Sequence, residues 1–250
     1  MSELISIVIP VHNAGQVLNE TIASVKSQTY GEWELILVDD GSSDNSVETA
    51  ETAAMGDDRI RLIRNTGSHG ASYARNAGVL DSKGRYLCFL DADDLWLPKK
   101  LEEQLGYMKS RDAAFSFTGY EFADEKGCGL GKTVRVPETI SYREALKNTT
   151  IFTSTVMFDL GRLKKSDIEM PHIESEDTAL WWRLLRNGVT GYGLDISLTL
   201  YRRSPGTLSS NKITAIKRIW RLYREAEGLS VPYSAYCFCF WAARAVLRRI

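Results

Sequence analysis

Two short stretches of the chain, residues 35–38 and 86–90, are apolar at every position instead of alternating with polar residues. A strand of this composition is buried on both faces, as the central strands of a parallel sheet are. Segments with helical periodicity separate such runs in the first half of the chain. This order of strand, helix and strand predicts an α/β domain with a mostly parallel, Rossmann-like sheet flanked by helices.

The same patterns give approximate element bounds. In the first half we expect strands at residues 5–11, 34–38, 61–63 and 86–90, with helices at 17–28 and 45–55. In the second half we expect strands at residues 115–122, 154–158 and 196–201, a helix capped by Ser175 that stops at Asn187 and Gly188, a turn at 204–206, and helices at about 212–227 and 233–249.

Length and composition bound the class of protein. The 250 residues, 44% of them hydrophobic, suffice for one sizeable core. No stretch approaches the roughly twenty apolar residues that span a bilayer, and the early apolar run lacks a basic flank, so we expect a protein that is not secreted. The four cysteines contain no CxxC pair, which argues against a disulfide framework or a zinc site.

Charge is distributed unevenly. Residues 201–250 hold ten basic and two acidic residues, although the whole chain has a net charge of −1. Such a tail suggests an anionic partner: a membrane surface, lipid phosphates or nucleic acid. The expected helix at 212–227 carries an apolar stripe of Ile213, Ile216, Ile219, Trp220 and Tyr223. Two hypotheses stay open, namely that the tail lies on an anionic membrane or that it packs on the catalytic domain or a second copy of it.

Three carboxylates follow the buried strand at 86–90: Asp91, Asp93 and Asp94. Open parallel sheets bind ligands at the carboxyl ends of their strands, and an extended chain would point Asp91 and Asp93 to the same side. Such a pair suits Mg²⁺ or Mn²⁺, which one or two carboxylates hold while phosphates and waters fill the other positions. The alternative is a surface turn that caps the next helix.

A second acidic pair, Asp39 and Asp40, ends the apolar strand at 34–38 and leads into Gly41 and Ser42. It reaches the same edge of the sheet. A carboxylate there could accept the imide N–H of a uracil ring. Alternatively, these residues simply form a turn and a helix cap, in which Asp, Gly and Ser are common.

Further candidates lie on expected helices. Glu176 and Asp177 occupy a first helical turn, where the helix dipole alone explains acids, but a carboxylate facing the crevice could also act as general base for an incoming hydroxyl. Arg75 lies in a helix-like segment that begins after Gly70, and it could face a diphosphate or stack near a base, unless it is simply a solvated helix arginine. The three histidines, at positions 12, 69 and 172, have no metal spacing and are expected in loops or at the surface.

Taken together, these residues resemble the family-2 inverting glycosyltransferases of the GT-A fold, from Ile5 to about Ser210. The resemblance rests on SIVIPVHN, LILVDDGSSDNS, GASYARNAG, YLCFLDADD and ESEDTALWWRLLRNG, in this order. The segment from Tyr201 to Ser209 is similar to a common tail of bacterial members. The Q-x-x-R-W element and transmembrane helices of processive synthases are missing, so we expect transfer of single sugars.

The resemblance implies a GT-A catalytic domain at 1–210, with a nucleotide-binding half at about 1–105 and an acceptor-binding half at about 106–210, and a C-terminal helical appendage at 211–250. It implies that Asp40 binds uracil, that Asp91 and Asp93 hold ribose and metal, with Asp93 the likelier direct ligand, and that Asp177 is the base. The candidate donor-binding residues are Pro10, Asn13, Asp39, Asp40, Arg75, Asp91 and Ala92. Candidates for contacts with the diphosphate or acceptor are Glu176, Tyr201, Arg202 and Arg203.

The implied activity is the metal-dependent, inverting transfer of one sugar from a nucleotide sugar, with uridine favoured, to a hydroxyl of a glycan or lipid-linked oligosaccharide in surface polysaccharide assembly. The enzyme is expected to be cytoplasmic, held at the inner face of the membrane by its tail, without a nucleic acid partner and with a homodimer left open. Two alternatives are a sugar-1-phosphate nucleotidyltransferase and a non-catalytic nucleotide-sugar binding module. The first usually has a glycine-rich loop after its first strand, but residues 10–15 contain one glycine.

Overall fold

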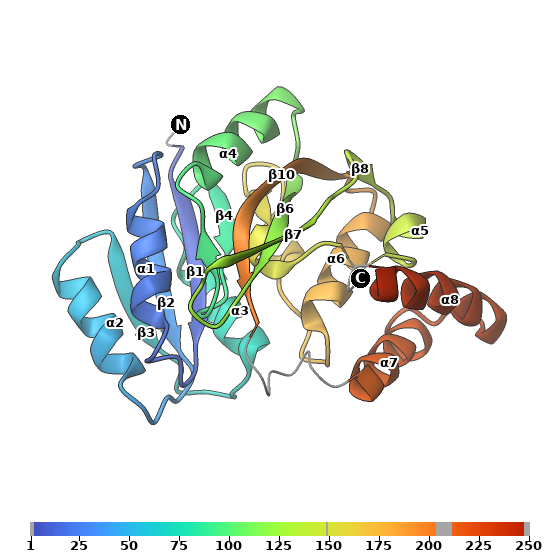
Figure 1. Cartoon of the computed structure of the whole chain (residues 1–250), viewed down its shortest axis with the longest axis horizontal. Helices are drawn as coiled ribbons and strands as arrows, with labels where there is room; N and C mark the ends of the chain where they lie inside the picture. The colour runs from blue at the N-terminus through green and yellow to red at the C-terminus, as the bar shows by residue number, and fades with distance from the viewer. Residues whose placement is uncertain (1–2, 149, 204–211, 248–250) are drawn as a thin grey trace.

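A computed structural model describes residues 3–148, 150–203 and 212–247 (Figure 1). Within these residues, ten strands form one sheet in the order β3-β2-β1-β4-β9-β6-β10-β5, with β7 paired to β6 and β8 to β10. The strands are β1 Ile5–Val11, β2 Trp33–Asp39, β3 Ile60–Arg64, β4 Tyr86–Phe89, β5 Leu95–Trp96, β6 Phe115–Ala123, β7 Gly129–Val134, β8 Thr139–Ile140, β9 Met157–Asp159 and β10 Gly191–Arg202.

The first half of the sheet is parallel. β1 pairs in parallel with both β2 and β4, and β2 pairs in parallel with β3. The short β9 runs antiparallel to β4 and β6 and so joins this half to the second, in which β10 is parallel to β6. The expected mostly parallel sheet is therefore confirmed, and the carboxyl ends of β1, β2 and β4 share one edge.

Helices cover both faces of the sheet (Figure 1). The α-helices are α1 Leu18–Lys26, α2 Ser46–Met55, α3 Ala71–Asp81, α4 Lys100–Ser110, α5 Tyr142–Ala145, α6 Glu176–Arg186, α7 Lys212–Arg221 and α8 Val231–Leu247. Short 3-10 helices occupy Thr153–Thr155 and Lys165–Asp167, and a π-helical turn, Leu222–Ala226, follows α7.

Side-chain alternation along the strands gives the two main clusters of the core, beside a small third cluster of Tyr120, Phe122 and Val134. Ile5, Ile7 and Ile9 of β1 pack with buried residues of α1 and α4, whereas Val8 faces α3 and α6 on the other side. Successive side chains of a strand point to opposite faces, so each all-apolar strand serves both clusters. This explains why residues 35–38 and 86–90 contain no polar position.

Two local expectations were wrong. Residues 154–158 do not form one strand, because Thr153–Thr155 is a 3-10 helix whose buried Ser154 bonds the turn after β4, and β9 covers only three residues. Ser175 does not cap α6 with its side chain, because its backbone is left-handed, with a φ of +58°, and no cap hydrogen bond forms. The helix stop is as expected, with Gly188 at a φ of +89° just beyond Asn187.

The C-terminal helices pack on the domain. Tyr223 is buried, stacks on Trp182 of α6 with ring centroids 5.2 Å apart, and donates its hydroxyl to the Leu146 carbonyl. Ile219 and Cys237 join the same core cluster. Of the apolar stripe of the helix at 212–227, Ile219 and Tyr223 are buried in the core and Ile216 is 45% exposed, so part of the stripe packs on the domain. The expected turn at 204–206 and the side chain of Ile213 lie outside the described residues.

None of the helices in the described ranges is both long enough and apolar enough to cross a bilayer.

Candidate functional site

A cleft of about 1130 Å³ opens at the shared carboxyl edge of β1, β2 and β4. Segments that follow these three strands line it together with the start of α3. Its polar lining includes His12, Asn13, Asp40, Asp44, His69, Asp91 and Asp93, and Pro10, Gly70 and Ala92 contribute backbone or apolar surface. The structure thus brings together most of the residues that the sequence predicted for donor binding.

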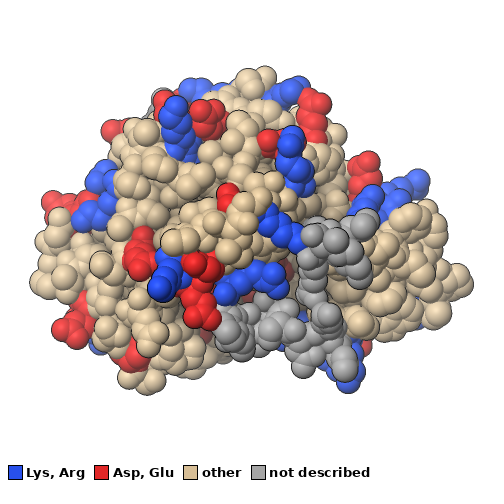
Figure 2. Space-filling model, viewed as in Figure 1, with Lys and Arg blue, Asp and Glu red and all other residues tan. Residues whose placement is uncertain are grey.

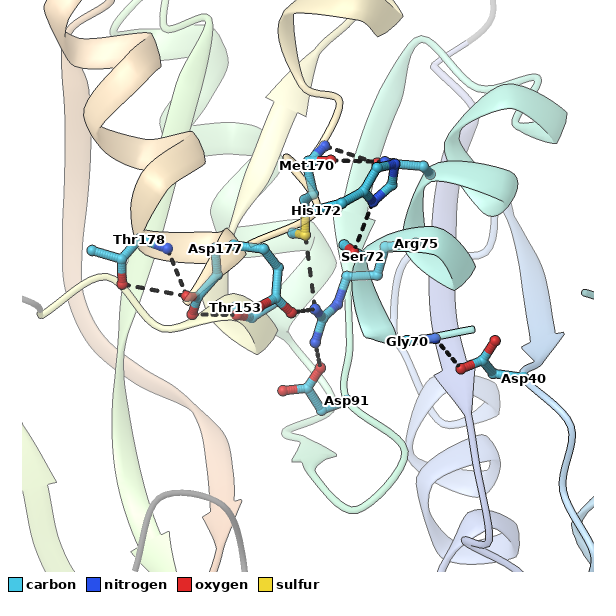
Figure 3. Close-up of polar contacts among 12 residues, drawn as sticks. Asp40, Gly70, Ser72, Arg75, Asp91, Thr153, Met170, His172, Asp177 and Thr178 are labelled. Carbon is cyan, nitrogen blue, oxygen red and sulfur yellow. Dashed lines mark hydrogen bonds and ion pairs between the residues drawn. The ribbon is translucent and has the colours of Figure 1, made fainter. Parts of the chain in front are cut away.

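One end of the cleft is organised around Asp40. Its carboxylate accepts hydrogen bonds from Asn65 Nδ2 at 2.7 Å, from the Gly70 amide at 2.6 Å and, with the appropriate tautomer, from His69 Nδ1 at 3.1 Å. Gly70 has a φ of +129° and directs its N–H at this carboxylate from the start of α3 (Figure 3). A carboxylate has about four acceptor positions, so one remains for a ligand.

Asn13 and Asp39 shape the neighbouring loops. Asn13 has a φ of +50°, and its side-chain oxygen accepts the Ser43 amide at 2.8 Å, which ties the segment after β1 to the segment after β2. The Asp39 carboxylate accepts the Ser42 amide at 3.1 Å and the Gly41 amide at 3.3 Å. Asp39 is therefore a turn residue in this structure and does not line the cleft, unlike its neighbour Asp40.

Asp91 to Asp94 form a turn and not the extended segment that we expected. The Asp94 amide donates to the Asp91 carbonyl at 3.1 Å. Ser154 Oγ accepts the Asp91 amide and donates to the buried Asp94 carboxylate, and Thr21 of α1 donates to the Ala92 carbonyl. The turn is thus fixed from two sides, and it still presents both Asp91 and Asp93 to the cleft.

The Asp93 carboxylate receives no hydrogen bond from any other residue of the described ranges, and burial together with the charge of Asp91 raises its pKa. The described residues contain no group of three or more metal-ligating side chains. Two carboxylates nevertheless fit a magnesium or manganese ion that takes its remaining ligands from phosphates and water. The donor set of the cleft therefore fits a cation that binds together with a nucleotide.

Arg75 does not face the cleft as a diphosphate ligand, and it is not a solvated arginine either. It is only 6% exposed. Its guanidinium donates to Asp91 at 2.6 Å and to Glu176 at 3.0 Å, and its Nε has no partner in the described residues (Figure 3). Burial by itself lowers the pKa of Arg75, but the charges of the neighbouring carboxylates outweigh it. The pKa of Arg75 is therefore raised.

Asp177 lies beside this network. Its carboxylate accepts Thr153 Oγ1 at 3.1 Å on one oxygen and the Thr178 amide at 2.6 Å on the other (Figure 3). Glu176, by contrast, is held by Arg75, and burial followed by the charge of Asp177 raises its pKa. The two adjacent acids therefore differ: Glu176 has a cationic partner, and Asp177 has only neutral donors.

Of the candidates after β10, Arg202 does not line the cleft in this structure. Its side chain is 2% exposed and donates to Glu20 and to the Glu125 carbonyl. Tyr201 packs among Tyr120, Phe122 and Phe152, and Arg203 lies over the Phe122 ring. None of the three lines the cleft, because the aromatic cluster and the Glu20 pair hold their side chains elsewhere.

Sequence reasoning missed several polar residues that build the site. Asn65 and His69 bond Asp40, Ser154 bonds the Asp91–Asp94 turn, and Thr153 bonds Asp177. The only local signal was the glycine- and serine-rich segment at 67–72. The histidines do lie in exposed loops as expected, but His12 and His69 also line the cleft.

Comparisons with known proteins agree with this geometry. The family model described as glycosyl transferase family 2 matches residues 6–161. The chain is 40% identical to the putative teichuronic acid biosynthesis glycosyltransferase TuaG of Bacillus subtilis, over 99% of this chain and 98% of the relative. It is 36% identical to WfgD of Escherichia coli, named as a UDP-Glc:α-D-GlcNAc-diphosphoundecaprenol β-1,3-glucosyltransferase, over 87% of this chain and 84% of the relative.

Solved structures show the same fold at lower identity. TarS 1–349 of Staphylococcus aureus with UDP-GlcNAc has a TM-score of 0.69 at 17% identity, over 95% of this chain and 71% of that one. The mannosyltransferase PcManGT of Pyrobaculum calidifontis with GDP-Man and Mn²⁺ has a TM-score of 0.70 at 14% identity, over 96% and 73%. The GT-A architecture is thereby confirmed. With its family match, its relatives and a cleft at the expected sheet edge, the chain belongs to glycosyl transferase family 2.

Proposed function

We propose that this glycosyltransferase moves one sugar, with inversion, from a UDP-sugar to a hydroxyl of a lipid-linked glycan in the assembly of a bacterial surface polysaccharide. The observation that carries the proposal is the cleft itself, in which Asp40, the Asp91–Asp93 pair and the start of α3 surround one volume. The names of TuaG and WfgD, which mention teichuronic acid and a diphosphoundecaprenol acceptor, support the acceptor class.

The donor is bound at two ends of the cleft in this proposal. The free acceptor position of Asp40 takes the imide N–H of uracil, which the three protein donors on this carboxylate orient. At the other end, Asp93, with Asp91, would hold a divalent cation next to the diphosphate. Such a cation offsets the charge that develops on a departing diphosphate. UDP-Glc in the names of two relatives supports the choice of uridine.

The acceptor hydroxyl is activated by Asp177. Thr153 and Thr178 orient its carboxylate with neutral hydrogen bonds, and an oriented carboxylate can take the proton of an incoming hydroxyl. Glu176 is the less suitable candidate because its ion pair with Arg75 holds the carboxylate in place. The hydroxyl attacks from the face opposite the diphosphate, so the anomeric configuration inverts. A diphosphate is a good leaving group, and no acid is needed to protonate it.

We also propose that the enzyme works on the inner face of the cell membrane, where a lipid-linked acceptor would meet a nucleotide sugar. A homodimer stays a prediction.

A screen of nucleotide sugars tests the proposal. The protein is incubated with each donor and Mn²⁺ or Mg²⁺, and the release of nucleoside diphosphate is measured with and without a diphosphopolyprenol-linked GlcNAc acceptor. We expect one UDP-sugar to give cation-dependent turnover, with a product of inverted anomeric configuration by NMR. Release of pyrophosphate from a nucleoside triphosphate and a sugar phosphate would instead indicate a nucleotidyltransferase, and binding without turnover a non-catalytic module.

A further inference from the structure

The outer face of α8 is apolar along most of its length. Cys237 and Ser234 are buried against the domain, and the side chains on the opposite face are exposed. The exposed apolar residues are Val231, Pro232, Ala235, Tyr236, Cys239, Phe240 and Ala243, and Arg244 is exposed at the end of this face. Figure 2 shows this end of the molecule, at the right, as a surface with few charged atoms, and both basic and acidic side chains lie at its border. An exposed patch of this kind marks an interaction surface.

Basic groups lie along one border of this face. The Lys147 ammonium is 5.7 Å from the ring centres of both Tyr236 and Phe240. Arg244, the next residue in the Pro232–Tyr236–Phe240 stripe, donates to the Lys147 carbonyl. Glu144 also lies near these groups, because both Lys147 and Arg244 contribute to the lowering of its pKa, after its capping contacts with Ser141. The border thus carries two basic groups, Lys147 and Arg244.

A pocket of about 320 Å³ adjoins this border. It is lined by Lys132, Thr133, Val134, Arg135, Asn148, Thr150 and Arg244. Thr150 is 4% exposed, and its hydroxyl has no hydrogen-bond partner in the described residues. Arg135 is paired with Asp195, but Lys132 forms no ion pair within the described ranges. A buried hydroxyl without a partner beside cationic groups suits an anionic oxygen ligand.

We propose that the outer face of α8 and this pocket together bind an anionic phospholipid bilayer, with Tyr236 and Phe240 in the interfacial layer and a headgroup phosphate in the pocket. Aromatic side chains next to basic ones are the pattern of interfacial contact. This proposal names the surface by which the enzyme would bind the membrane in the proposed function. It rests on the proposed function only in one respect: a lipid-linked acceptor is the reason for the enzyme to bind a bilayer.

Charge favours a bilayer over a second copy of the chain. In a two-fold symmetric dimer the same patch faces itself, so Lys147 and Arg244 of one copy would approach those of the other. Like charges brought together in this way oppose association, whereas anionic headgroups attract them.

Two cysteines offer a matched pair of probe positions. Cys239 lies on the outer face of α8 and is exposed, Cys128 is exposed near β7, and Cys88 and Cys237 are buried. An environment-sensitive thiol fluorophore is placed on Cys239 in a Cys128→Ser protein, and on Cys128 in a Cys239→Ser protein. With phosphatidylcholine vesicles containing phosphatidylglycerol at low salt, we expect a blue shift from Cys239 and none from Cys128. No shift at Cys239, or an equal shift at both positions, would overturn the proposal.

Substitutions separate the two parts of the surface. Tyr236→Ser with Phe240→Ser should release most of the protein from these vesicles in co-sedimentation. Lys132→Gln with Arg244→Gln should weaken binding by about fivefold for each charge removed. As matched controls, Leu80→Ser removes an apolar side chain that is 75% exposed elsewhere, and Lys26→Gln with Lys83→Gln removes two exposed charges elsewhere. Controls that lose binding as strongly as the test variants would contradict a specific surface.

Failure of this inference is distinguishable from failure of the proposed function, because vesicle binding is measured without turnover. Donor hydrolysis in free solution should be equal in all variants. Hydrolysis without vesicle binding would refute only the lipid surface, and vesicle binding without any transferase activity would refute only the proposed function. Sedimentation velocity gives the remaining outcome, since a dimer that Tyr236→Ser dissociates would show that this face binds a second copy and not lipid.

Discussion

Arg75 joins Asp91 to Glu176: its guanidinium donates to the first at 2.6 Å and to the second at 3.0 Å, although these residues lie 16 and 101 positions away along the chain. One buried cation thus fixes the end of β4 against the first turn of α6. The carboxylates proposed for cation binding and for proton transfer depend on this link for their relative position, since Asp177 follows Glu176 directly.

Loss of this link should therefore affect both stability and turnover. We expect Arg75→Met to lower the free energy of unfolding by about 3 kcal/mol, because it leaves two partly buried carboxylates without their cation. Arg75→Lys keeps the charge but not the two-pronged geometry, so it should recover more stability than turnover. Chemical denaturation and steady-state kinetics measure the two effects. The control is Arg85→Lys at the Asp159 pair, where an equal loss of turnover would contradict a specific role.

A second prediction concerns the opposite end of the sheet. Glu34 accepts hydrogen bonds from Ser6, the Lys83 amide and Arg61. Although burial opposes it, these contacts lower the pKa of Glu34 from its ordinary value of 4.5. A carboxylate with a lowered pKa stabilises the fold above its unfolded pKa and loses this effect as pH falls through the lowered value.

We therefore expect Glu34→Gln to lower the free energy of unfolding by about 2 kcal/mol at neutral pH, and the difference from the wild type to shrink below pH 4.5. Denaturant titrations across pH measure it. Glu51→Gln, at a half-exposed pair with Arg64, should change little at any pH. A constant deficit at all pH values would mean that Glu34 acts by packing and not by charge.

Strands were predicted best from the sequence where their residues have a clear preference for the strand conformation. The expected strand at residues 5–11 matches β1, and the expected strand at 115–122 falls within β6, because both segments are rich in the β-branched and aromatic residues that favour strands. The prediction failed at Ser154, where a β-like pattern forms a 3-10 turn instead. The reason is tertiary: the Ser154 hydroxyl is required by Asp91 and Asp94, which no local pattern reveals.

The same reasoning separates the site residues. Asp40, Asp91 and Asp93 could be placed at one edge because each follows a parallel strand, and the cleft contains all three. The directions of the Arg75 and Arg202 side chains could not be predicted, because a long side chain can turn either to the cleft or to an acid of another element. That choice depends on partners such as Glu176 and Glu20, which only the fold brings near.

Asp93 should be required for cation-dependent turnover but not for folding. We expect Asp93→Ala to abolish this turnover and leave the melting temperature unchanged or higher, because burial disfavours the charge that the substitution removes. Activity assays with and without a chelator, and thermal unfolding, measure the two effects. Asp58→Ala, at an exposed acid far from the cleft, is the control. Full turnover of the wild type in chelator would remove the cation from the mechanism.

The base preference should follow the acceptor position that remains on Asp40. We expect UDP to bind more tightly than GDP or CDP in calorimetry. The imide N–H of uracil can donate a hydrogen bond to the Asp40 carboxylate, and cytosine has no N–H at that ring position. TDP carries the same imide N–H as UDP, so its binding discriminates least between the hypotheses. Tighter binding of GDP or CDP than of UDP would contradict the role assigned to Asp40.

The last prediction separates Asp177 from its neighbour. Asp177→Asn keeps the side-chain shape and the contacts with Thr153 and Thr178 on at least one oxygen, but it removes the ability to take a proton. We expect turnover to fall at least about a hundredfold while the dissociation constant of the donor stays the same, because general-base catalysis contributes two to four orders of magnitude.

Glu176→Gln is the matched control one residue away. It weakens the Arg75 ion pair, so it should lower stability, but it should reduce turnover much less than Asp177→Asn does. Transfer rates, donor calorimetry and thermal unfolding of both variants distinguish the cases. If Glu176→Gln is the more damaging to turnover, Glu176 is the base. If Asp177→Asn fails to bind the donor or unfolds, Asp177 has a structural role at the start of α6.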